Sequence, residues 1–245
     1  MFTAILILVF CLMTLGQKSK LVKKIDYLTT PFELSLNTLP PNFPGHNASF
    51  VFSSLVPMAA ETQIGCGKFE KSQDCQDRLN RLYDKTLWKD FTARNLLAFS
   101  IPNECDYNAD AEKFWCSSSF NGYTWSHKKI GSDTYTGQNA FGVKKIVKYE
   151  KFENIIIEVD RTKPDFTLKD IKPDEARRLN SNLRLLIIGE TSQPFVRRKS
   201  VSYKPTLDEP NHTEGDNKFI IVEVKEIWIY DFETGKVFEK KKYNG

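Results

Sequence analysis

The chain has 245 residues, of which 40% are hydrophobic and 27% charged, with 18 Phe, 9 Tyr and a formal net charge of +4. This composition excludes wholesale disorder and supplies enough apolar residues for a substantial core. The basic residues come mostly as pairs separated by acids, and no basic patch with interleaved aromatic residues stands out. We therefore expect no nucleic-acid partner.

The first segment, residues 2–16, carries no charge and is almost entirely apolar. A helix of this length spans about 22 Å, less than the ~30 Å hydrocarbon core of a bilayer, so the length favours a secretory signal peptide. No Lys or Arg precedes the segment and several lysines follow it, which also suits an uncleaved anchor and hence an N-terminal membrane association. Cys11 raises a third interpretation, a lipoprotein, although Phe10 is too large for the small residue expected before a lipidated cysteine.

Four further cysteines follow: Cys66, Cys75, Cys105 and Cys116. An even number in an exported chain indicates two disulfide bonds. Three pairings are possible, and we favour Cys66–Cys75 with Cys105–Cys116, since a hairpin turning at residues 110–111 places the second pair directly opposite one another. The alternative is four reduced, buried thiols in a cytosolic protein. A zinc site is not expected, because there is no C-x-x-C motif.

The sequence predicts helices in the first part of the expected domain. Residues 48–55 form a short helix for which Asn47 is a suitable N-cap. Residues 69–84 show the strongest helical pattern, with Ser72 as a candidate N-cap and charged residues on one face. The apolar stripe of this helix consists of Cys75, Leu79 and Leu82.

Strands are predicted at residues 96–101 and 113–120, on either side of the polar segment 106–112. Within that segment, Asp106-x-Asn108-x-Asp110-x-Glu112 begins as a calcium-binding loop does, with oxygen ligands at alternate positions. The later part does not fit, because Ala111 stands where such a loop needs glycine and Ser117 where it needs a bidentate glutamate. We therefore interpret the segment as a polar hairpin turn closed by a disulfide, and we expect no metal and no other cofactor.

Residues 134–160 are the stretch around which the chain is organised. It opens with a turn bracketed by glycines, GQNAFG at residues 137–142, and continues with alternating apolar and polar residues. A break at residues 150–154 precedes the apolar block 155–159. The pattern predicts two paired antiparallel strands, which we take as the central hairpin of a sheet.

The chain then predicts a helix, a strand and a loop. Pro173 and the acids after it suit the first turn of a helix. Residues 183–188 are apolar enough for the middle of a sheet, and Gly189 is expected to end that strand. Residues 193–215 are polar and contain Pro and a basic cluster, so we predict a long mobile loop.

The C-terminal part predicts a final hairpin. Residues 219–230 form a long strand, and Gly235 supplies a positive φ in the turn before an edge strand. Helices first and then mostly hairpin strands predict an α+β fold, with a largely antiparallel sheet of hairpins and two or three helices packed on it. The expected organisation is a signal peptide or membrane segment at 1–16, a polar spacer at 17–38 and a single domain at 39–245.

No catalytic signature is present in the sequence. There is no G-x-S-x-G elbow, P-loop or dinucleotide fingerprint. The three histidines, His46, His127 and His212, lie in predicted turns or loops without an acid or nucleophile at a recognisable spacing. The sequence therefore points away from an enzyme.

Three segments together carry a resemblance. Residues 136–143 (TGQNAFGV), the helix start at 69–72 and the final hairpin at 231–237 resemble a family of exported bacterial proteins described only as a domain of unknown function. The likeness covers about residues 39–240 in order and spacing. It implies bacterial export and a single α+β domain, but no catalytic residues, and the four cysteines are not a feature of that family.

The leading hypothesis is a non-enzymatic bacterial envelope protein, periplasmic or secreted, that binds a partner protein or an envelope component. Its expected contact segments are the turn at 137–142 and the loop at 193–215. One alternative is a periplasmic hydrolase in which the fold gathers acids and His127 in a cleft. Another is an inhibitor or immunity protein anchored to the inner membrane. The candidate binding residues are Gln138, Asn139, Arg197 and Arg198.

Overall fold

The computed structural model describes residues 25–117, 122–159 and 165–243. Strands make up 51% of the structure and helices 17%, so the protein is mainly β and the expected α+β class holds only loosely. Most strand pairs are antiparallel, as predicted. The predicted signal peptide or membrane segment at residues 1–16 lies outside the described residues. No described helix is long and apolar enough to cross a membrane.

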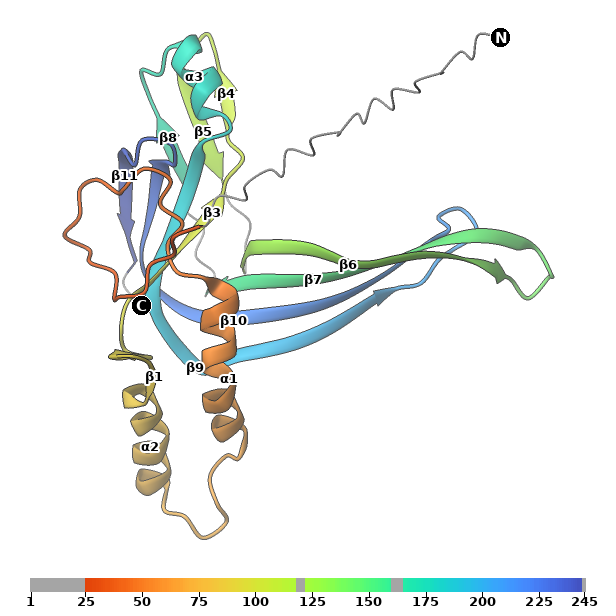
Figure 1. Ribbon diagram of the computed structural model, residues 1–245, viewed down its shortest axis with the longest axis horizontal. Helices are drawn as coiled ribbons and strands as arrows, with labels where there is room; N and C mark the ends of the chain where they lie inside the picture. Colours follow the sequence, from red (N-terminus) through yellow and green to blue (C-terminus); the bar gives the residue numbers. More distant parts are fainter. Residues whose placement is uncertain (1–24, 118–121, 160–164, 244–245) are drawn as a thin grey trace, which may run out of the picture.

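A six-stranded sheet dominates the fold (Figure 1). Its order is β3-β9-β10-β7-β6, with β11 also paired to β10. The pair β7–β10 is parallel and the other pairs are antiparallel. The strands are β3 (Leu97–Pro102), β6 (Tyr123–Gln138), β7 (Lys144–Val159), β9 (Leu183–Tyr203), β10 (Asn211–Asp231) and β11 (Val237–Lys242).

Smaller elements surround this sheet. Strands β1 (Thr86–Trp88) and β2 (Phe91–Thr92) form a two-stranded ribbon, and β4 (Asp106–Asn108), β5 (Lys113–Ser117) and β8 (Asp165–Leu168) form a three-stranded sheet. The helical elements of the described chain are α1 (Ala48–Gln63), α2 (Ser72–Arg81), the 3-10 turn η1 (Leu82–Asp84) and α3 (Pro173–Leu179).

The central sheet buries both faces in the body of the protein. One face packs against α1 and the smaller elements, with Leu55, Ile187 and Ile229 fully buried there. Residues 25–46 cover the other face, where Phe32 meets Trp228 edge to face at 5.3 Å between ring centroids. The described part of the predicted spacer therefore contributes to the core.

Local sequence signals account for the helix ends. The side chain of Asn47 accepts a hydrogen bond from the Phe50 N–H, which confirms the predicted N-cap of α1. That helix continues to Gln63, well beyond the predicted end. The predicted N-cap of α2 was wrong: Ser72 is the first helical residue and Lys71 is the N-cap, so the helix begins one residue earlier than that cap implied. Helix α3 starts at Pro173 as predicted, because proline suits a position whose N–H has no partner within the helix.

Both predicted disulfides form. Cys66 and Cys75 are bonded, with their Cα atoms 5.5 Å apart, and so are Cys105 and Cys116. The β4–β5 register pairs Asp106 with Trp115, so the second pair of cysteines lies directly opposite, as the hairpin argument required.

Two predictions about strands were wrong. Residues 144–159 form one continuous strand, and the expected break at 150–154 is part of it, because these residues pair with β6 on one side and β10 on the other. Residues 193–215 are mostly strand rather than loop, since β9 runs past Gly189 to Tyr203 and β10 starts at Asn211. Polar composition misled the prediction, because residues 197–203 and 211–214 are exposed or only partly buried although they form strands.

Candidate interaction surface on the β arm

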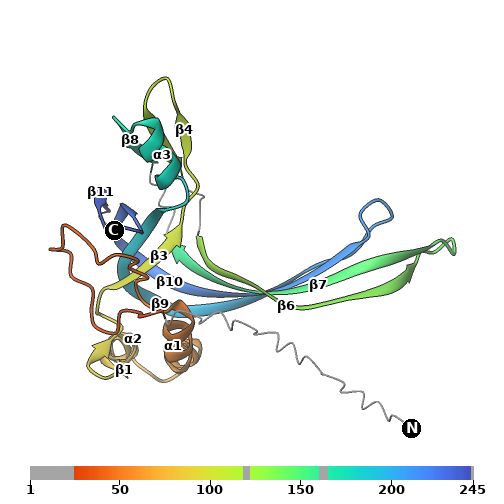
Figure 2. The same ribbon diagram turned by 45° about the horizontal axis from the view of Figure 1, so that its top comes forward.

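Four strands extend beyond the body as a projection, seen from two directions in Figures 1 and 2. We call residues 127–154 and 199–217 the β arm. A row of directly paired residues marks its base: His127 on β6, Asn154 on β7, Asn217 on β10 and Lys199 on β9. From Asn154 to Lys144, at about 3.3 Å per residue, the arm extends roughly 33 Å.

Polar side chains tie the strands together at the base. Asn154 donates its amide to the Asn217 side-chain oxygen at 2.7 Å, and its own oxygen lies 2.6 Å from His127 Nδ1. The His127 ring also stacks on Phe152, with ring centroids 4.4 Å apart. His127 is exposed, and the side chain that it hydrogen-bonds is an amide rather than a carboxylate. The cleft with acids that the hydrolase hypothesis requires is not built around His127 by the described residues.

A second cluster surrounds His212 further along the arm. His212 Nδ1 lies 3.2 Å from the Tyr135 hydroxyl, while its Nε2 faces both Ser202 Oγ at 3.4 Å and Glu214 Oε1 at 3.7 Å. In a catalytic triad the acid and the hydroxyl contact opposite ring nitrogens, so this is not a triad. Tyr149 donates to Glu214 at 2.7 Å, a hydrogen bond that raises the pKa of Tyr149. The cluster links four neighbouring strands, β9, β10, β7 and β6.

The arm ends in two adjacent loops, which we call the arm tip, residues 135–148 and 203–211. The Lys148 N–H donates to the Pro210 carbonyl oxygen at 3.0 Å, and the Lys145 ammonium donates to the Leu207 carbonyl oxygen. The two contact segments expected from the sequence therefore meet at one place, although only residues 204–210 of the second segment form a loop.

The turn at the tip is held by Asn139. Its side-chain oxygen accepts from the N–H groups of Phe141 at 3.0 Å and Val143 at 2.9 Å. Gly142 takes a φ of +84°, which a glycine adopts without strain. Asn139, a predicted binding residue, thus shapes the turn, while Gln138 beside it is exposed.

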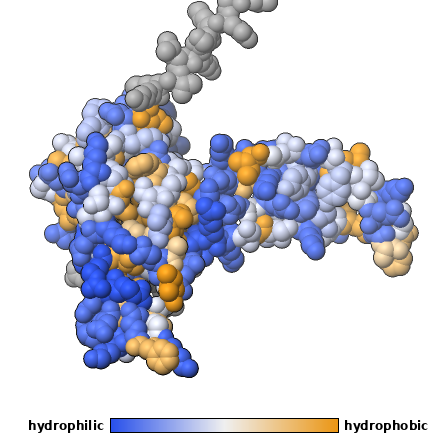
Figure 3. Space-filling model, turned by 60° about the horizontal axis from the view of Figure 1, so that its bottom comes forward, coloured by the Kyte–Doolittle hydropathy of each residue, from blue (hydrophilic) through white to orange (hydrophobic). Residues whose placement is uncertain are grey.

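Large apolar side chains gather in the tip. Six of the 14 exposed large hydrophobic residues of the described chain lie there, which is far more than its short length would supply. Phe141 is 91% exposed, Ile146 70% and Tyr203 67%. The other three are Tyr135, Val143 and Leu207. In the space-filling view of Figure 3 a pale orange, hydrophobic group lies at the far end of the arm, next to hydrophilic residues. Such a concentration on a projecting element makes the tip a candidate contact surface.

The two predicted arginines lie elsewhere, near the base of the arm. Arg197 forms a two-pronged ion pair with Glu158, with N–O distances of 2.7 and 2.9 Å, and its guanidinium lies 3.7 Å from the Phe219 ring centroid. The Glu158 carboxylate raises the pKa of Arg197. Arg198 lies over the Phe52 ring of α1 at 5.4 Å. Arg197 pairs with Phe219 on β10, which lies eight residue steps, about 26 Å, from Asn211 in the tip. The four predicted binding residues therefore form two groups.

The predicted calcium-like segment forms the polar turn. The Asn108 side-chain oxygen accepts from the Ala111 N–H at 2.9 Å, and the Glu112 carboxylate pairs with Lys172 at 3.4 Å. These contacts use two of the four oxygen-bearing side chains to build the hairpin and fix it to the start of α3.

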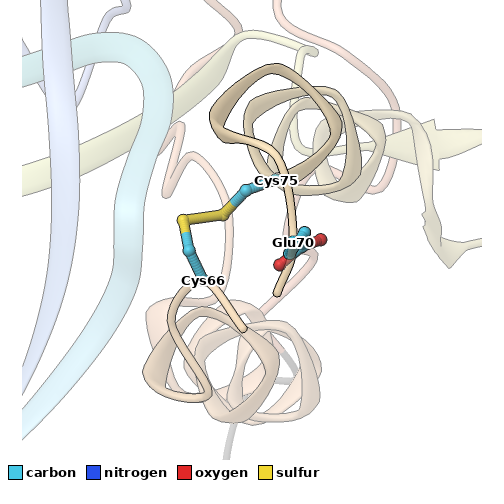
Figure 4. Close-up of side chains that lie close together, drawn as sticks. All are labelled: Cys66, Glu70 and Cys75. Carbon is cyan, nitrogen blue, oxygen red and sulfur yellow. A yellow bond between two sulfur atoms is a disulfide. The ribbon is translucent and has the colours of Figure 1, made fainter. Parts of the chain in front are cut away.

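One trio of ligand types lies close together in the described chain: Cys66, Glu70 and Cys75, within 4.8 Å of one another. Figure 4 shows the two sulfur atoms joined as a disulfide beside Glu70. Metals bind thiolates, so the bonded sulfurs are not ligands. Glu70 instead accepts from Arg78 at 3.0 Å and from the Gly67 N–H at 2.9 Å, and these bonds lower its pKa to about 2.

Sequence reasoning placed Phe141 inside a contact turn but did not single out Ile146, Tyr203 or Leu207. The sequence signal that could have found them is a large apolar residue within or beside a turn that contains Gly or Pro, because such a turn faces water. Comparisons with known proteins add no further assignment, since no family model, curated protein or solved structure matches the chain. The resemblance of residues 136–143 to an exported family stays a prediction.

Proposed function

We propose that this chain is an exported bacterial envelope protein that acts as a binding module, with the tip of the β arm contacting a partner protein. The observation that carries the proposal is the concentration of exposed apolar side chains at the end of a projection, led by Phe141 at 91% exposure. Aromatic residues on such surfaces commonly supply most of the binding energy.

Two disulfides support export, because they persist in oxidising compartments such as the periplasm. The apolar segment at residues 2–16 supports the same location. We therefore place the protein in the periplasm or outside the cell, with anchoring to the inner membrane as the alternative.

The edges of the arm favour a protein partner over insertion into lipid. In the described chain, the outer edges of the arm parts of β6 (residues 127–138) and β9 (residues 199–203) pair with no other strand. Their free N–H and C=O groups suit strand addition by a polypeptide. In the hydrocarbon of a bilayer, each unpaired N–H or C=O group of these edges would cost several kcal/mol. A lipid bilayer could therefore take up only the turn.

The charged residues of the tip indicate what kind of partner surface would complement it. Four lysines and two acids lie in the tip: Lys144, Lys145, Lys148, Lys204, Asp208 and Glu209. A partner with an apolar pocket bordered by acidic groups complements this surface. An inhibitor or immunity protein that captures a basic toxin would need an acidic face, and the tip has the opposite sign.

Photo-crosslinking in the native host tests the proposal. A photoreactive phenylalanine analogue replaces Phe141 in one variant and Phe69 in a control, because Phe69 is equally exposed at 94% on a different part of the molecule. We expect a discrete protein adduct from position 141 that position 69 does not give. With the purified partner, Phe141→Ala should weaken binding at least tenfold and Phe69→Ala should not, since a central aromatic contact is worth about 2 kcal/mol or more.

Two results would overturn the proposal. One is the same set of adducts from positions 141 and 69, which would show nonspecific contact. The other is adducts at position 141 with lipid alone, which would make the tip a membrane contact instead.

A further inference from the structure

A groove lies on the three-stranded sheet β4-β5-β8, remote from the β arm in Figure 1. The inner face of this sheet carries Phe114, Phe166 and Leu168, all buried in the core. Because side chains alternate along a strand, the intervening residues face outward and form the floor of the groove. The floor and rim consist of Asp106, Tyr107, Asn108, Ala109, Asp110, Lys113, Trp115 and Thr167.

Trp115 is the central side chain of this surface. It is 54% exposed, although an indole ring normally lies mostly buried in a protein of this size. The register places Asp106 directly opposite it on β4 and Thr167 directly opposite it on β8. A flat apolar ring is thus flanked by a carboxylate on one side and a hydroxyl on the other.

The charged groups of the groove make no ion pair with the described residues. The carboxylates of Asp106 and Asp110 and the ammonium of Lys113 also take part in no side-chain hydrogen bond there. Asn108 uses its oxygen to hold the turn, which leaves its amide N–H groups to act as donors. The groove therefore offers both acceptors and donors around the indole ring.

The charged and hydrogen-bonding groups of the groove favour one class of ligand. An anionic ligand would be repelled by the two carboxylates, and a cationic ligand, which only donates, would leave the Lys113 ammonium without an acceptor. A neutral sugar satisfies all of them, because the C–H face of its ring packs on an aromatic ring while its hydroxyl groups both donate and accept hydrogen bonds. The volume of about 750 Å³ lies within the range of ligand-binding sites and has room for more than one sugar ring.

We propose that this groove, the Trp115 groove, binds a neutral oligosaccharide. Trp115 stacks on one sugar ring, the Asp106 and Asp110 carboxylates accept from its hydroxyl groups, and Lys113 donates to them. This site does not depend on the function proposed for the arm tip.

The test uses the purified protein labelled with 5-fluorotryptophan. The chain has four tryptophans, Trp88, Trp115, Trp125 and Trp228, so a fluorine spectrum contains few signals. The Trp115 signal is identified by its loss in Trp115→Phe. The probes are the tetramers of β-1,4-linked N-acetylglucosamine, β-1,4-linked glucose and α-1,4-linked glucose.

We expect a saturable shift of the Trp115 signal with at least one tetramer. By calorimetry, Trp115→Ala should lower the affinity at least tenfold and Asp106→Asn should lower it measurably, while Phe69→Ala, at an exposed position outside both proposed sites, serves as the unchanged control. All three positions are exposed, so the variants should keep the wild-type unfolding transition. The absence of a saturable Trp115 shift with every tetramer at 10 mM, or unchanged affinity in Trp115→Ala, would overturn the proposal.

Discussion

The backbone N–H of Lys148 donates to the carbonyl oxygen of Pro210 at 3.0 Å, and this bond joins two hairpins that are distant in the sequence. It lies at the start of the parallel pairing of β7 with β10, in which Lys148 is opposite Asn211. Because of this pairing, the turn after β6 and the loop after β9 form one surface. The contact function proposed for the arm tip rests on that arrangement.

Gly235 should tolerate no side chain, because it combines a φ of +77° with a close backbone contact. A Cβ atom there would lie 1.8 Å from the Leu39 carbonyl oxygen. We expect Gly235→Ala to lower the free energy of unfolding by about 3 kcal/mol or more, measured by urea denaturation.

Gly142 is the matched control for Gly235. It has a similar φ of +84°, but a Cβ atom there would meet only the Gln138 amide at 3.7 Å. Gly142→Ala should therefore cost only the backbone strain, about 1 kcal/mol. Equal losses in the two variants would contradict the close contact at Gly235.

The disulfides should stabilise the fold by limiting the unfolded chain. The two bonds close short loops, with sequence separations of 9 for Cys66–Cys75 and 11 for Cys105–Cys116. For loops of this length the entropic model gives about 2–3 kcal/mol each. Replacing Cys105 and Cys116 together by Ala should lower the unfolding midpoint accordingly.

Intact mass provides the control for the disulfides. The purified wild-type protein should gain about four mass units on full reduction, because each disulfide takes up two hydrogen atoms. The Cys105→Ala, Cys116→Ala double variant should gain about two. A native chain with no mass change on reduction would contradict both bonds and the argument for export.

His46 should make stability depend on pH. Burial lowers its pKa from 6.5 to about 4, and the neutral ring accepts from the Ala98 N–H at 3.0 Å while donating to the Thr30 carbonyl oxygen at 3.0 Å. The unfolded chain binds a proton below pH 6.5 that the folded chain takes up only near pH 4. The contribution of His46 to the free energy of unfolding is therefore fully present above pH 6.5. It falls by up to about 3 kcal/mol as the pH drops to 4.

The measurement is the free energy of unfolding at several pH values between 6.5 and 4.5. His46→Gln should flatten the dependence in this window, whatever its effect on stability at neutral pH. The control is a substitution at an exposed residue without an ionisable side chain, and Phe69→Ala should keep the wild-type slope. A wild-type slope in His46→Gln would show that other groups cause the dependence.

Arg197 should act through its contacts with Glu158 and Phe219 rather than through a ligand. We expect Arg197→Ala to lower the free energy of unfolding by about 1 kcal/mol, because it removes a two-pronged ion pair and a cation–π contact from a partly exposed site. Lysine should not restore the loss, since it cannot form the paired hydrogen bonds.

A double-mutant cycle of Arg197→Ala with Glu158→Ala isolates the pair. We expect a coupling energy of about 0.5–1 kcal/mol. Arg198→Ala is the control, because within the described residues Arg198 lies 5.4 Å from the Phe52 ring and forms no ion pair, so the variant should stay within about 0.5 kcal/mol of wild type. A coupling energy near zero would contradict the structural role of Arg197.

The sequence by itself determined the features that depend only on residues close together along the chain. The Asn47 cap, the start of α3 at Pro173 and the positive φ of Gly235 all follow from local backbone chemistry. The Cys105–Cys116 bond also follows, because a short hairpin fixes which residues lie opposite one another.

Only the tertiary structure decided how far the long strands extend and which side chains they bring to the arm tip. Residues 193–203 and 211–215 are polar enough to suggest a loop, yet they form strands because backbone pairing with distant segments outweighs the weak local preference of a water-exposed strand. The same long-range pairing separates Arg197 from Gln138 and brings Phe141 to the end of a projection. Alternation of side chains across strands far apart in sequence likewise places Trp115 between Asp106 and Thr167, a neighbourhood that no sequence spacing specifies.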